Sequence, residues 1–144
     1  MRGLFPEFRG IQPYFWELSE GFGECGATLH LIEDERIDAG GVLAQSRFPA
    51  LPGMSVQLNY YLTCLSASKL LPQCLQQFAQ GNLAAKAQDP DAGAYYRWPD
   101  SAAFDRLYAR GYCLVSVRDV WRMLSGHFDS FEASELLSLR AGAS

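Results

Sequence analysis

The sequence predicts an α/β fold, and three observations lead to this prediction. Residues 25–32 show the β-branched and apolar alternation of a strand, and residues 42–48 are predicted to be a second strand, which Pro49 ends. Residues 55–79 instead place apolar side chains at steps of three and four, which is the spacing of one face of a helix. The 144 residues are 49% hydrophobic and 19% charged, so we expect one globular domain with a modest core.

The first half of the chain is expected to run from a loop through a helix into the two strands. Glycines and prolines punctuate residues 1–12, which therefore form a loop. A helix follows at residues 13–20, because Pro13 suits a first helical position, where an N–H group would have no intrahelical partner. A charged turn with the sequence EDERIDAGG connects the two strands.

The second half is expected to be mainly helical. The helix at 55–79 contains Pro72, which should kink or split it, because proline removes an intrahelical hydrogen bond and crowds the preceding turn. A polar linker separates this helix from a short one at 101–110. Residues 112–117 are expected to form a strand or an extended segment, and the tail after Gly126 is expected to be frayed.

Composition argues against several classes of protein. The net charge of −4 and the absence of a Lys/Arg cluster make nucleic-acid binding improbable. The sequence has no apolar run of the ~18 residues that a membrane span needs and no signal-peptide pattern, so we expect a cytoplasmic location. No metal site is expected, because the four cysteines are scattered and only two histidines are present. The cysteines are expected to be small buried side chains without disulfides.

Three motifs in the first third of the chain indicate chemistry. Residues 4–10 read LFPEFRG, residues 26–30 read GATLH, and residues 37–40 read IDAG. In this order and spacing they resemble the folate-dependent formyltransferases, which include methionyl-tRNA formyltransferase, the sugar-nucleotide N-formyltransferases and glycinamide ribonucleotide formyltransferase. The resemblance implies a partial Rossmann-like domain with a mixed sheet flanked by helices. It also implies that 10-formyltetrahydrofolate is the formyl donor.

The family pattern begins with an Asn-x-His element that this sequence does not contain. Counted back from the LFPEFRG motif, the family His falls at Met1, and the Asn would precede it. The resemblance covers about residues 3–117 and corresponds to the second half of the family's catalytic domain. We therefore expect residues 1–117 to form that half, truncated at its N-terminus, and residues 118–144 to form a C-terminal helix and tail.

The resemblance assigns a catalytic position and a cofactor-binding turn. Asp38 matches the family's catalytic Asp, which holds the His in its charged form and relays protons through water. The turn before it, formed by Asp34, Glu35, Arg36 and Ile37, matches the backbone that hydrogen-bonds the pterin ring of the folate. The alternatives are that Asp38 is an ordinary solvated carboxylate and that the turn is only a polar hairpin connection.

Candidate substrate-binding residues lie in the first loop and helix. Arg9 can hold a phosphate or carboxylate in a bidentate fork, and Gly10 lets the chain turn close to a substrate. Alternatively, Arg9 pairs with a neighbouring carboxylate such as Glu7. Tyr14 matches the family's substrate-side helix, although aromatic residues on a short helix are more often part of a core. His30 is not expected to act in catalysis.

Three functional hypotheses remain open on the sequence alone. The first is a formyltransferase-like protein that acts on a small amine, such as an amino-sugar nucleotide, and that is inactive or very weak as this isolated chain. The second is a non-catalytic binding or dimerisation module that associates through an exposed sheet. The third is a relative of formyltetrahydrofolate hydrolase, in which water replaces the amine.

Overall fold

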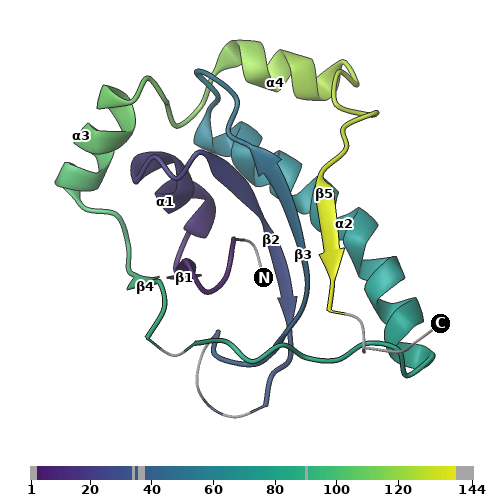
Figure 1. Ribbon diagram of the computed structural model, residues 1–144. Helices are drawn as coiled ribbons and strands as arrows, with labels where there is room; N and C mark the ends of the chain where they lie inside the picture. Colours follow the sequence, from purple (N-terminus) through teal and green to yellow (C-terminus); the bar gives the residue numbers. More distant parts are fainter. Residues whose placement is uncertain (1–2, 34, 36–37, 90, 139–144) are drawn as a thin grey trace.

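The computed structural model of the protein describes residues 3–33, 35, 38–89 and 91–138. Two small sheets and four helices alternate along this part of the chain (Figure 1). In chain order the elements are β1 (Phe8–Gly10), α1 (Pro13–Ser19), β2 (Glu24–His30), β3 (Val42–Pro49), α2 (Val56–Ala79), β4 (Ala94–Tyr96), α3 (Ser101–Ala109), α4 (Val117–Leu124) and β5 (Ser134–Leu137). The predicted α/β class is confirmed.

The main sheet has the strand order β2-β3-β5 and is antiparallel throughout the described residues. The two predicted strands form its centre and one side, with Gly26 opposite Arg47. The third strand, β5, pairs with β3 from Ala44 to Arg47. The expectation of a frayed tail was therefore wrong for residues 134–137, which gain their order from the hydrogen bonds of β3, whereas residues 139–144 lie outside the described residues.

A second sheet consists of two three-residue strands. Strand β1 pairs in parallel with β4, with Arg9 opposite Tyr95 and Gly10 opposite Tyr96. Residues 1–12 were expected to form a loop because of their glycines and prolines, but this segment contains a short strand, β1. Residues 112–116 contain no strand, although Cys113 forms an isolated bridge with Ser55 before α4 begins.

Helix α2 packs against one face of the main sheet, and Figure 1 shows it running behind β2, β3 and β5. Its N-terminus is capped by Ser55, whose hydroxyl accepts a hydrogen bond from the backbone N–H of Leu58 at 3.1 Å. The helix continues through Pro72, so the predicted split does not occur. Leu70 and Cys74, one on each side of Pro72, are buried against the sheet, and this packing holds both halves in one helix.

The N-terminal segment and α1 pack beside β2, where the N–H of Gly3 donates to the carbonyl of Gly26 and α1 contacts both β2 and α2. Leu4, Phe15 and Leu18 are almost fully buried there, in the larger of two hydrophobic clusters. Strand β2 is accordingly buried on both faces, as Cys25 and Thr28 show with no exposed surface. This arrangement brings the residues of the LFPEFRG motif onto the sheet beside the end of β2.

Several large apolar side chains remain exposed on the helices. On α4, Val117, Trp121 and Leu124 lie at helical spacing and are between 69% and 86% exposed. Apolar exposure is not confined to the helices, since Leu136 on β5 is 69% exposed, and association through the sheet stays a prediction. None of the described helices is both long and apolar enough to cross a membrane.

Candidate functional site

Asp38 lies in the turn between β2 and β3 and is 5% exposed. One of its carboxylate oxygens, Oδ2, accepts a hydrogen bond from the backbone N–H of Gly10 at 3.0 Å. Its backbone has φ of 60°, a left-handed conformation that side chains other than glycine rarely adopt. Such strained residues cluster at functional sites, where the surrounding structure holds them. The interpretation of Asp38 as a solvated turn residue is therefore wrong.

His30 lies beside Asp38, which the sequence analysis did not predict. Its Nε2 is 3.8 Å from Asp38 Oδ1, and both side chains are nearly buried. Its other ring nitrogen, Nδ1, is 2.9 Å from the carbonyl oxygen of Leu31 and must carry a proton to make that bond, because a carbonyl only accepts.

Gln88 fixes the turn from the other side, and nothing in the sequence indicated this role. Its Nε2 donates to the backbone carbonyls of Asp38 at 3.0 Å and Gly40 at 2.6 Å. Gln88 lies in the segment that was expected to be a polar linker, 50 residues beyond Asp38. Contacts of this kind have no local pattern, because only the fold brings the two segments together.

The predicted pterin-binding turn is only partly within the described residues. Asp34, Arg36 and Ile37 lie outside them, and Glu35 is exposed. The assignment of this turn to a cofactor therefore stays a prediction.

Arg9 and Gly10 lie where β1 meets β4. The Nη2 of Arg9 donates to the backbone carbonyl of Ala92 at 2.9 Å. Gly10 has φ of 102°, and a Cβ at this position would collide with the backbone of Tyr96. A glycine is thus required both by its own conformation and by the close approach of β4. The carboxylate suggested as an alternative partner for Arg9, Glu7, lies 3.6 Å from Arg47 through its Oε1.

Tyr14 contributes to packing around α1. Its ring meets that of Tyr60 edge to face, with centroids 5.1 Å apart, and its backbone carbonyl accepts from Asn59 at 2.7 Å. The structure places Gly10 and His30 each beside the carboxylate of Asp38, whereas Tyr14 packs between helices. Substrate binding by Tyr14 remains a prediction.

The segment that precedes the LFPEFRG loop is held on the sheet by buried hydrogen bonds. The backbone N–H of Gly3 donates to Gly26 at 2.9 Å, and the hydroxyl of Thr28 donates to the carbonyl of Gly3 at 2.8 Å. The same hydroxyl accepts from the N–H of Phe5 at 3.1 Å. The carboxylate of Glu17 accepts the N–H of Leu4 at 3.2 Å. The backbone that leads toward Asp38 is therefore rigidly placed.

Glu17 is the most strongly perturbed acid of this region. It has no exposed surface, and burial raises its pKa to about 8, although hydrogen bonds from Asn59 and Leu4 oppose this shift. Burial also raises the pKa of the neighbouring Cys25 thiol, with the charge of Glu17 acting in the same direction. Both groups are therefore neutral near pH 7, and Glu17 acts as a structural anchor for Leu4.

Several solved structures share the fold of this chain. The N-formyltransferase from Helicobacter canadensis, in complex with folinic acid and dTDP-3-aminofucose, matches with a TM-score of 0.63 at 18% identity, over 74% of this chain and 44% of that one. The formyltransferase PseJ from Anoxybacillus kamchatkensis, in complex with a UDP-linked formamido sugar and tetrahydrofolate, matches with a TM-score of 0.61 at 19% identity, over 76% and 62%.

HypX from Aquifex aeolicus also matches, with a TM-score of 0.57 at 20% identity, over 76% of this chain and 21% of that one. At these identities the likeness establishes a shared fold. The chain spans less than two thirds of the length of each of these three proteins.

A family model described as formyl transferase matches residues 2–75, which is just over half of the chain. The matched range includes Gly10, His30 and Asp38, the three residues that the structure brings together. The chain therefore belongs to the formyl transferase family.

Proposed function

We propose that this chain carries part of a formyl-transfer site in which Asp38 is the proton-relay residue. The observation that supports this most is the placement of Asp38, buried in a left-handed conformation between the N–H of Gly10 and the imidazole of His30. The donor would be 10-formyltetrahydrofolate, and the acceptor a small amine.

The chemistry assigns separate tasks to the residues of such a site. Attack of an amine on the formyl carbon produces a tetrahedral oxyanion, which needs hydrogen-bond donors, and the amine must lose a proton. Asp38 would take that proton through water at Oδ1, since Oδ2 is the oxygen that accepts the Gly10 N–H. The oxyanion donors of the family are an Asn and a His, and the sequence of this chain contains neither in the family's pattern.

Formyl transfer by the 144-residue chain alone is therefore expected to be absent or very slow. Each missing oxyanion donor costs about 100- to 1,000-fold in rate. The fixed backbone of Gly3 and Leu4 supplies a defined point at which an upstream segment with those donors would meet Asp38.

An amino-sugar nucleotide is the acceptor that the comparisons favour. One matched structure contains dTDP-3-aminofucose and another a UDP-linked formamido sugar. In this chain, Arg9 lies on β1 directly before Gly10, and we propose that its guanidinium holds an acidic group of such a substrate.

Binding of folinic acid tests the cofactor side of this proposal. We expect folinic acid to bind the chain only in the millimolar range, corresponding to about −4 kcal/mol, because one wall of the family's folate pocket is not formed by these residues. In amide NMR spectra, the signals of Glu35 and Asp38 should shift, and those of α4 should not. Micromolar affinity, or shifts confined to the helices, would argue against the turn as the pterin site.

A further inference from the structure

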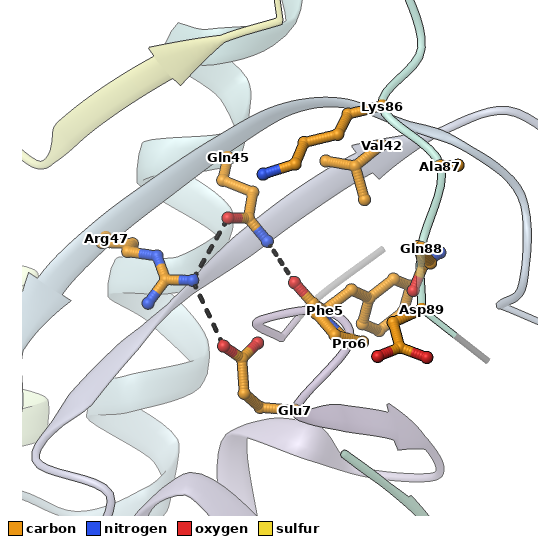
Figure 2. Close-up of a pocket in the computed structure, with 10 residues that line it drawn as sticks. All are labelled: Phe5, Pro6, Glu7, Val42, Gln45, Arg47, Lys86, Ala87, Gln88 and Asp89. Atoms are coloured by element: carbon orange, nitrogen blue, oxygen red, sulfur yellow. Dashed lines mark hydrogen bonds and ion pairs between the residues drawn. The ribbon is translucent and has the colours of Figure 1, made fainter. Parts of the chain in front are cut away.

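A pocket of about 310 Å³ lies on the sheet face opposite α2 (Figure 2). Its walls come from the loop at residues 5–7, from strand β3 and from residues 86–89, and Figure 2 shows their side chains converging on it. The volume is at the lower end of the range of small-molecule sites. Asp38 does not line it, but Gln88, which does, also donates to the backbone carbonyl of Asp38.

One wall of the pocket is already internally paired. Arg47 lies 3.2 Å from a carboxylate oxygen of Glu24 and 3.6 Å from one of Glu7. It also donates to Oε1 of Gln45 at 3.2 Å, while Nε2 of Gln45 donates to the carbonyl of Phe5 at 2.6 Å. The charge of Arg47 is therefore compensated, and Gln45 is held in one orientation.

Lys86 lines the same pocket without such compensation. Its backbone is fixed to the start of β3, since its N–H and C=O both bond Val42 at 2.8 Å. Its ammonium group has no ion-pair or hydrogen-bond partner among the described residues. Figure 2 shows this group turned toward Gln45 over the pocket. A ligand anion placed there would provide the missing partner.

The other end of the pocket has an excess of acceptors. Asp89 forms no ion pair with any described residue, and its Oδ1 accepts only the N–H of Asp91 at 2.9 Å. Glu7 Oε2 and Gln88 Oε1 are buried and have no hydrogen-bond partner within the described part of the chain. Buried acceptors without partners are unfavourable, so a donor entering here would be stabilised. Figure 2 places Glu7 and Asp89 on the side of the pocket away from Lys86.

We propose that this pocket binds a small zwitterion, a primary ammonium and a carboxylate joined by a short aliphatic chain. The carboxylate would meet Lys86, and the ammonium would meet the acceptors around Asp89. Between these ends the pocket is lined by the apolar side chains of Pro6, Val42 and Ala87, which suit methylene groups. The proposal requires no formyl transfer, so it stands independently of the function proposed above.

Three probes of matched length test it on the 144-residue chain. They are 5-aminopentanoate, pentanoate, which lacks the ammonium, and pentylamine, which lacks the carboxylate. We expect 5-aminopentanoate to shift the amide signals of residues 86–89 with millimolar affinity, and each other probe to bind about tenfold more weakly. The substitutions Lys86→Gln and Asp89→Asn should each weaken 5-aminopentanoate about tenfold.

Matched variants separate the effect of a lost charge on binding from an effect on folding. Lys86→Arg and Asp89→Glu should retain binding, and Asp105→Asn, on the exposed surface of α3, should have no effect. The substituted side chains are exposed, so unchanged thermal unfolding is expected in each case. Equal binding of pentanoate and 5-aminopentanoate would reduce the pocket to an anion site and overturn the zwitterion proposal. Absence of any shift at residues 86–89 with all three probes would overturn the site itself.

Discussion

Replacing Asp38 with Asn is expected to lower kcat/KM for formyl transfer by about 100- to 10,000-fold, once the chain is joined ahead of Gly3 to a family segment that carries the Asn and the His. The amide keeps the size of the side chain and can still accept the N–H of Gly10, which lies 3.0 Å from Oδ2. The amide cannot take up a proton or hold a charged imidazole. A fall in kcat/KM would therefore show that the proton-relay role of Asp38 is lost, while its size and its bond to Gly10 are kept. Steady-state release of tetrahydrofolate provides the rate.

Two further variants make this result specific to Asp38. His30→Gln should reduce the rate less than tenfold. His30 lies 3.8 Å from Asp38, so we expect it to orient the carboxylate without contacting the substrate itself. Asp105→Asn should leave the rate unchanged. If Asp38→Asn retained the parental rate while folding normally, Asp38 would not be the relay residue.

The stability of the chain is expected to fall by about 2 kcal/mol between about pH 6 and about pH 8, and Glu17→Gln should remove most of this dependence. Burial raises the pKa of Glu17 from 4.5 to about 8. The folded state therefore keeps a proton that the unfolded chain releases near pH 4.5. Because the unfolded state binds fewer protons between these two values, the free energy of unfolding decreases as the pH rises, and it levels off above pH 8.

Urea denaturation at the two pH values measures this slope, the change in the free energy of unfolding with pH. Glu20→Gln is the matched control, since Glu20 follows the same helix but pairs at the surface with Arg106 at 3.0 Å. It should keep the slope of the parent chain. An unchanged slope in Glu17→Gln would mean that another buried group, and not Glu17, holds the proton.

The parts of the fold that could be predicted from the sequence are those with enough residues to show a period. Strand β2 and helix α2 each repeat their apolar pattern several times, and the predicted positions of β2, β3 and α2 agree with the structure within two residues. Strands β1 and β4 have three residues each and show no alternation. Strand β5 is mostly exposed, so its order depends on pairing with β3 and leaves no hydrophobic signal.

The residues of the candidate site also fall into two groups, those that lie in sequence motifs and those that only the fold brings together. Asp38 and Gly10 could be identified because both lie in contiguous motifs with fixed spacing. His30 also lies in a motif, but its position beside Asp38 depends on how the turn after β2 closes. Gln88 and the pocket at Lys86 arise from contacts between segments about 40 to 80 residues apart, which no local sequence pattern encodes.

The most direct test of the central claim, that this chain holds only the Asp38 side of a formyl-transfer site, is the rate of formyl transfer from 10-formyltetrahydrofolate with and without an upstream Asn-x-His segment. We expect no transfer above the uncatalysed rate from the 144-residue chain alone, and measurable transfer once the segment is joined ahead of Gly3. Transfer by the chain alone, abolished by Asp38→Asn, would contradict the claim and show that the described residues form a complete site.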